Sequence, residues 1–295
     1  MNDIELHKLT HDEQSAVLPL LGVCFPTCWQ SIADTCSEMP FEEISFGAFD
    51  ADKLVAHCGL IPHDIYMNGS WYTIAGIASV AVAPEYRKKG VAKMLCSFAA
   101  EWAEANDYAL LPLYTEFFRV YEICGWEKFV IPPTVKRKNS SNIECKVDWK
   151  RGSELTETEK NTIINIYESG ETFNGKIKRL PQGKLQSWDR IFSKNHCFAL
   201  NCRMYAALVD GVLAEIYFAP KVSDEEKRNF FSSLGEHPCY LPPTASTKML
   251  MAEYDWQLSD DDAMHGERPM IRIPQKSNAV SENIHSLFFA LMDKF

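Results

Sequence analysis

The spacing of apolar and polar residues divides the chain into short segments that alternate between strand and helix patterns. Thr10 and Glu13 form a capping box, which marks the start of a helix. Asn68-Gly69 between two apolar runs is a strong hairpin signal, while Gly59 and Pro62 indicate an interruption of the earlier strand. In order, the first half is expected to contain strands at 4–9, 44–49, 54–67, 71–82, 108–114 and 126–131, and helices at 11–24, 31–39, 90–106 and 116–124.

The second half mixes helix and strand patterns in the same way and contains no short-period repeat. A polar, turn-rich run at 139–142 separates the halves, and the basic run at 136–138 is interpreted as a solvated part of this linker. The fold class is therefore expected to be α+β, with domains at 1–140 and 146–295. The expected elements are helices at 156–167, 185–193, 223–234 and 281–295, a hairpin over 205–218, and strands at 249–254 and 269–273.

Composition narrows the class of protein. The 295 residues suit about two domains, and 46% hydrophobic residues are ample for a buried core. No apolar run reaches the ~18 residues of a membrane helix. The polar start at 1–11 argues against a signal peptide, so a cytoplasmic location is expected. Ten cysteines without C-x-x-C spacing favour reduced, mostly buried thiols, and no metal site is expected.

The formal net charge of −10 argues against a general nucleic-acid binder. It suits a cationic substrate such as an amine, which a negative protein attracts at long range. Neither a nucleic-acid nor a membrane partner is expected. Against this acidic background, the basic cluster Arg87, Lys88, Lys89 and Lys93 stands out.

This basic cluster follows an apolar run that stops at Pro84, and a helix pattern begins after Gly90. The first N–H groups of a helix have no internal partner and, with the helix dipole, form an anion site to which basic side chains add. Gly90 has no Cβ, so a phosphate could approach the main chain closely. A surface turn with solvated bases is the alternative interpretation.

The sequence Arg87-x-x-Gly90-x-Ala92 after Val82-Ala83-Pro84 resembles the acetyl-CoA signature of the GNAT family of N-acetyltransferases. It departs from the P-loop and from the G-x-G-x-x-G of dinucleotide folds. The resemblance implies a GNAT fold in the first domain and acetyl-CoA as co-substrate. It also implies coenzyme contacts from Val80, Ala81, Val82, Arg87, Lys88, Lys89, Gly90, Val91, Ala92 and Lys93.

A second match, residues 118–126, resembles the GNAT motif Phe-Tyr-x-x-x-Gly-Phe and places Tyr121 at the family's tyrosine near the coenzyme sulfur. A tyrosine, with a reference pKa of ~10, is suited to protonating a departing thiolate. A core tyrosine on an amphipathic helix is the alternative. The strand at 71–82 holds no carboxylate to act as a base, which leaves Glu43, Asp64 or Glu116 acting through water.

A narrower resemblance is to the Eis-type (enhanced intracellular survival) acetyltransferases. Gly175-x-Ile177-x-Arg179 and Trp188 are similar to a stretch in the second domain of that group. This resemblance implies a second, degenerate GNAT-like domain, with the group's last domain reduced or absent. In longer relatives a terminal phenylalanine carboxylate enters the active site, so Phe295 is a further candidate catalytic group.

Together these patterns predict an N-acetyltransferase that moves an acetyl group directly to a primary amine in a ternary complex. The amine would belong to a small molecule or a peptide. The alternatives are a catalytically reduced acyl-CoA-binding regulatory protein and a general interaction protein with chance motif matches. The identity of the amine and formation of a homo-oligomer stay open.

Overall fold

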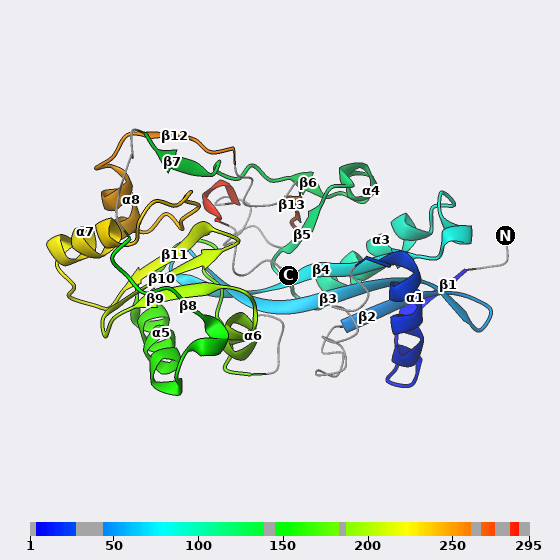
Figure 1. The fold of residues 1–295 in the computed structure, drawn as a ribbon. Coiled ribbons are helices and arrows are strands. Elements are labelled where there is room, and N and C mark those ends of the chain that lie inside the picture. Colours follow the sequence, from blue (N-terminus) through cyan, green and yellow to red (C-terminus); the bar gives the residue numbers. More distant parts are fainter. Residues whose placement is uncertain are drawn as a thin grey trace.

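A computed structural model describes residues 4–27, 44–138, 145–182, 187–260, 267–274 and 284–288. The chain forms two α+β halves, and the long β3–β4 hairpin runs from the first half into the second (Figure 1). The first half contains β1 (Glu5–Lys8), α1 (Val17–Cys24), β2 (Ile44–Asp50), β3 (Lys53–Met67), β4 (Ser70–Val82), α3 (Val91–Ala105), β5 (Leu111–Thr115), α4 (Phe118–Glu122) and β6 (Glu127–Lys128).

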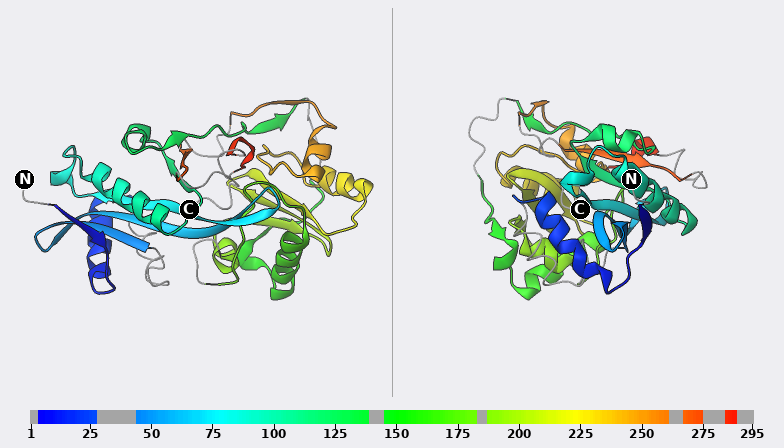
Figure 2. Two further views of the ribbon diagram at one scale, coloured as in Figure 1. Left: turned by 180° about the vertical axis from the view of Figure 1, so that it is seen from behind. Right: turned by 90° about the vertical axis from the view of Figure 1, so that its right-hand side faces the viewer.

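The first sheet has the antiparallel order β1-β2-β3-β4. Asn68 and Gly69 adopt φ of 47° and 88° at the β3–β4 turn, which confirms the predicted hairpin. The helices α3 and α1 cover opposite faces of this sheet (Figure 2). Leu95 of α3 belongs to the core cluster with Phe46, and Leu21 of α1 packs in the cluster with Phe49.

Two predictions near the start of the chain need correction. The expected helix 11–24 begins as a 3-10 turn at Glu13–Ala16, and the α-helix starts only at Val17. Pro19 explains the delay, because it has no N–H to donate to the preceding turn. Strand β3 is continuous despite Pro62. Ala75, opposite Pro62 on β4, donates its N–H to Leu110 on its other side, so Pro62 occupies a position where the β3–β4 ladder needs no N–H.

The second half contains β8 (Lys150–Arg151), α5 (Glu157–Ser169), α6 (Trp188–Ser193), β9 (Cys197–Leu200), β10 (Met204–Val209), β11 (Val212–Phe218), α7 (Asp224–Ser233) and α8 (Ala245–Met251). Its sheet has the order β11-β10-β9-β8. Alternate residues of β10 enter two different cores: Tyr205 lies in the core under α5 and α6, and Ala206 in the core under α7 and α8. A strand buried on both faces explains the nearly continuous apolar run at 204–218.

The two halves exchange strands. Strand β13 (Arg268–Arg272), from the end of the chain, lies between β5 and β6 and pairs antiparallel with both. Conversely, β7 (Val135–Arg137) lies between β12 (Trp256–Leu258) and Cys239 of the second half. The strands β8 to β11 followed by α7 thus repeat the order of β1 to β4 followed by α3, and each half is completed by a strand from the other.

The exchange overturns the interpretation of 136–138 as a solvated run. Arg137 is buried, and its guanidinium lies 4.5 Å from the ring centre of Phe231 and 4.1 Å from that of Tyr254. The predicted strand 249–254 is also wrong, since its first residues end α8, whose N-cap is Thr244.

The predicted last helix, 281–295, is wrong where the structure describes it. A 3-10 turn at Ile284–Ser286 is followed by non-helical residues. The expected helix at 31–39 and the polar run at 139–142 lie outside the described residues.

Candidate active site

The second part of β4 has an open edge. Along its whole length β4 pairs with β3. On the other side, the segment before β5 joins it only at its first part, through Ala75 N–H to Leu110 O (3.0 Å) and Ala109 N–H to Thr73 O (2.9 Å). Strand β5 then pairs with β13 instead. Within the described chain, this divergence leaves the β5 side of 77–82 without a strand neighbour.

A β-bulge interrupts β4 at this open edge. Ala78 lies opposite Gly59 and Ala81 opposite His57, so Ser79 and Val80 together face the single residue Cys58. Ser79 has a φ of 53°, a left-handed conformation that is uncommon for a residue with a side chain.

A buried histidine holds the bulge. Nδ1 of His57 donates to the Ser79 carbonyl at 2.9 Å, and Nε2 accepts from the Ser45 hydroxyl at 3.1 Å. The carbonyl can only accept, which fixes the tautomer with hydrogen on Nδ1. Burial lowers the pKa of His57 to about 4, so the ring is neutral at physiological pH.

The basic turn after β4 has the geometry of an anion site. A 3-10 turn at Pro84–Tyr86 ends the strand, and Lys88 and Gly90 follow with φ of 61° and 82°. The first N–H groups of α3 project from this turn without a capping side chain. A Cβ on Gly90 would meet no atom within 4 Å, so its positive φ, rather than crowding, calls for glycine.

The surrounding side chains fix the turn in place. The Tyr86 hydroxyl donates to Asp50 of β2 at 2.6 Å, and Lys53 binds Glu85 at 2.7 Å. The ammonium of Lys53 lowers the pKa of the Glu85 carboxyl. Nε of Arg87 donates to the Val82 carbonyl at 3.0 Å, so the base of its side chain is attached to the end of β4. The predicted coenzyme residues Arg87, Lys88, Lys89 and Gly90 are exposed, whereas Val91 is buried beneath the turn.

Tyr121 of α4 lies on the α3 side of the same sheet. Its ring packs against the core cluster that contains Cys58, the residue opposite the bulge. Burial raises the pKa of Tyr121, and the neighbouring thiols Cys96, Cys58 and Cys124 add to this shift. The hydroxyl therefore carries its proton at neutral pH.

The candidate bases differ in position. Asp64 accepts from Thr73 at 2.8 Å, and it lies five residues along β3 from Gly59, which is about 17 Å. Glu116 follows β5 directly. Strand β5 leaves β4 after Leu110, so Glu116 lies on the open-edge side of β4 but outside its register. Glu43 and Phe295 lie outside the described residues.

The turn between β11 and α7 of the second half corresponds to the basic turn between β4 and α3, but it lacks the features of an anion site. Only five residues, 219–223, separate β11 from α7, whereas eight separate β4 from α3. The first turn of α7 carries Asp224, Glu225 and Glu226, and Ser223 caps it with Glu226. Three carboxylates at a helix N-terminus repel an anion, so this half offers no equivalent phosphate site.

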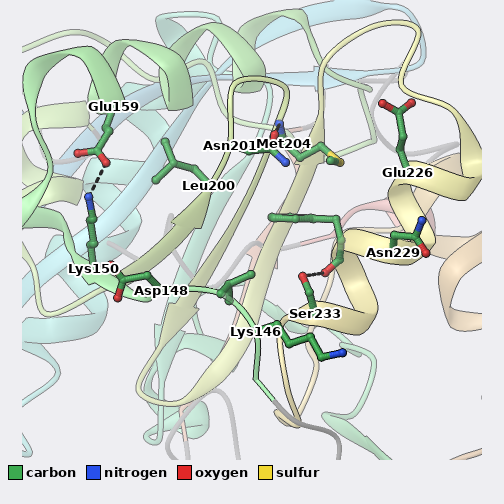
Figure 3. Close-up of a pocket in the computed structure, with 12 residues that line it drawn as sticks. Lys146, Asp148, Lys150, Glu159, Leu200, Asn201, Met204, Glu226, Asn229 and Ser233 are labelled. Carbon is green, nitrogen blue, oxygen red and sulfur yellow. Dashed lines mark hydrogen bonds and ion pairs between the residues drawn. The ribbon is translucent and has the colours of Figure 1, made fainter.

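A pocket of about 610 Å³ opens on the second half, between the segment 146–150, α5 and α7 (Figure 3). Lys150 at its edge pairs with Glu159 at 2.7 Å, and Glu226 pairs with Arg203 at 2.9 Å. None of its lining residues belongs to β4, α3 or α4. The pocket is therefore separate from the candidate active site.

Neither a cluster of metal ligands nor a membrane-spanning helix is found in the part of the chain that the structure describes. No three His, Cys, Asp or Glu side chains of the described residues gather as ligands for a metal ion. Likewise, no helix in the described ranges combines the length and apolar character needed to cross a membrane.

Sequence patterns do not single out His57, Ser45 or Ser79 as site residues. A single histidine in an apolar run predicts a core position and nothing more, and neither serine carries a turn signal. The bulge depends on the register between two strands, which no local pattern encodes.

Comparisons with known proteins agree with this geometry. The family model described as an acetyltransferase (GNAT) domain matches residues 5–129. No curated protein matches the sequence. Among solved structures, a GCN5-related N-acetyltransferase from Kribbella flavida is 18% identical with a TM-score of 0.63, over 92% of this chain and 71% of that chain.

Two further structures are similar over both halves. A GCN5-related N-acetyltransferase from Anabaena variabilis is 16% identical, with a TM-score of 0.62 over 92% of this chain and 73% of its own. Eis1 from Mycobacterium abscessus is 13% identical, with a TM-score of 0.61 over 95% and 75%. At these identities the structures establish the fold, while the family model covers the half that holds the basic turn and Tyr121. Residues 5–129 therefore match a GNAT acetyltransferase domain, and the two halves together have the fold shared by these longer structures.

Proposed function

We propose that the chain is an acetyl-CoA-dependent N-acetyltransferase that transfers the acetyl group directly to a primary amine in a ternary complex. The observation that carries this proposal is the continuity of three features: the open edge of β4, the basic turn at its end and Tyr121 beside it. The edge would pair with the pantetheine arm, and the turn would bind the pyrophosphate.

The transfer needs no covalent enzyme intermediate. The amine nitrogen attacks the thioester carbonyl, a C–N bond forms and the C–S bond breaks. The proton of the amine passes to a base, and the departing thiolate takes a proton from the Tyr121 hydroxyl. The oxygen of the carbonyl gains negative charge in the transition state, so an N–H donor of β4 directed at it would lower the barrier.

We infer that Glu116, which follows β5 on the open-edge side of β4, accepts the amine proton through water. We expect Glu116→Gln to lower kcat/KM several-fold without changing the Kd of acetyl-CoA. Asp64→Asn is the matched control, since Asp64 lies too far along β3. An equal effect of the two substitutions would remove Glu116 from the mechanism. The carboxylate of Phe295 remains an alternative base on the resemblance alone.

Calorimetric titration with acetyl-CoA tests the coenzyme site. The wild type should bind with a micromolar Kd, and Arg87→Glu should weaken binding about tenfold or more, because a negative charge replaces a positive one beside the pyrophosphate. Lys221→Glu makes the same charge change in the corresponding turn of the second half and should leave Kd unchanged. Absence of binding to the wild type would refute the proposal.

Release of free thiol from acetyl-CoA in the presence of primary amines then separates the two acyl-CoA hypotheses. An acetyltransferase releases thiol in proportion to the amine that it acetylates. A catalytically reduced regulatory protein would bind acetyl-CoA with the same affinity and release thiol with none of the amines.

A further inference from the structure

The bulge in β4 has an orientation that follows from one peptide bond. The peptide between Ser79 and Val80 is trans, so the Ser79 carbonyl and the Val80 N–H point in opposite directions. The carbonyl points at Nδ1 of His57. Consequently the Val80 N–H points away from the His57 ring and from β3, towards the open edge.

The two faces of the sheet further define the direction of the Val80 N–H bond. Ala56, Cys58 and Leu60 of β3 belong to the core under α3. His57, which alternates with them along the strand, therefore lies on the opposite face. Since the Ser79 carbonyl points at His57, the Val80 N–H points towards the α3 side, on which Tyr121 also packs.

The ring of His57 has little freedom to move. Its side chain is fully buried, and both nitrogens are bonded, one to Ser79 and the other to Ser45 of β2. Ser45 is itself buried. The left-handed φ of Ser79 costs about 1 kcal/mol or more, so a bonded neighbour is needed to keep the bulge in this one state.

We propose that His57, held by Ser45, is a positioning residue that locks the β4 bulge so that the Val80 N–H faces the acyl carbonyl of the coenzyme. The proposal rests on the proposed function for the coenzyme site, and it assigns residues outside both sequence motifs. His57 touches neither substrate. It acts through the Ser79–Val80 peptide.

The test uses two amide substitutions at the same position. The side-chain amide of His57→Asn lies near the place of Nδ1 and can still donate to Ser79. The longer side chain of His57→Gln places its amide near Nε2 and loses that bond. His63→Asn is the control, because His63 is also buried on β3 but lies opposite Ile74 in the regular part of the register.

The measurement is the ¹³C NMR shift of carbonyl-labelled acetyl-CoA bound to each variant, with the Kd of CoA measured in parallel. A hydrogen bond to the carbonyl moves its resonance downfield from the free value. Wild type, His57→Asn and His63→Asn should all show this displacement, and His57→Gln should lose most of it. Turnover of His57→Gln should fall about tenfold to a hundredfold, while the Kd of CoA, which lacks the carbonyl, stays within about twofold.

Equal displacement in wild type and His57→Gln would overturn the proposal, as would equal loss in the Asn and Gln variants. The two proposals fail differently. A wild type that does not bind acetyl-CoA refutes the coenzyme site, whereas a wild type that binds it without a displaced carbonyl resonance refutes only the positioning role.

Discussion

Met270 offers a direct test of the strand exchange. It lies on β13, opposite Leu113 of β5 and Lys128 of β6, and its side chain is fully buried in the core of the first half. The same cluster contains Leu95 of α3 and Trp126. If β13 completes this core, Met270→Ala must destabilise the half that carries the acetyltransferase motifs.

The magnitude follows from the atoms removed. The substitution deletes a methylene, a sulfur and a methyl group, and at about 0.8 kcal/mol per buried methylene the transfer contribution is about 2.4 kcal/mol. The cavity adds to this, which gives a loss of about 3 kcal/mol within the range of about 2–5 kcal/mol found for buried Met→Ala changes. Leu258→Ala on β12 is the control, since Leu258 is 69% exposed and should change stability by about 0.5 kcal/mol or less.

Urea unfolding followed by circular dichroism measures the free-energy change, and hydrogen exchange locates it. The amides of β5 and β6 should exchange faster in Met270→Ala than in the wild type, because β13 pairs with both strands. A loss below about 1 kcal/mol, or faster exchange confined to the second half, would refute the argument that β13 belongs to the first core.

Three further predictions concern the site. Tyr121→Phe should lower kcat about a hundredfold and leave the Kd of acetyl-CoA unchanged, because it removes only a proton donor; unchanged turnover would exclude Tyr121 from the chemistry. Tyr86→Phe loses the bond to Asp50 and should raise the Kd of acetyl-CoA about threefold to tenfold in calorimetry; an unchanged Kd would show that the turn does not need this anchor. Burial lowers the pKa of His57 from 6.5 to about 4. As the pH falls, the unfolded chain therefore takes up a proton on this imidazole before the folded chain does. The contribution of His57 to the free energy of unfolding is complete above pH 6.5 and falls by about 3 kcal/mol as the pH drops towards 4. His57→Asn should flatten this part of the urea-unfolding profile, leaving a slope of the same sign from His237; an unchanged slope would contradict the assignment.

Local patterns predicted most elements of the described chain. The Asn68-Gly69 turn and the α3 helix lie where the sequence places them, because each depends on residues adjacent along the chain. The sequence-based predictions were wrong where contacts with distant segments determine the local structure. The run at 136–138 looks solvated on its own, yet Arg137 is buried against aromatic rings of the second half.

Part of the candidate site could likewise be predicted from the sequence, and part of it could not. The basic turn and Tyr121 are recognisable because anion binding and proton donation need particular residue types at fixed spacing. By contrast, the direction of the Val80 N–H depends on a bulge, on His57 and on Ser45, which are brought together by three different strands.

The sequence by itself determined the succession of strands and helices, the basic turn at the start of α3 and the type of chemistry available there, since these follow from periodicity, turn residues and side-chain functional groups. Only the tertiary structure decided which strands complete each half and which edge of β4 stays open. Those features depend on contacts between segments far apart in the chain, where packing and hydrogen bonding between strands outweigh local preference.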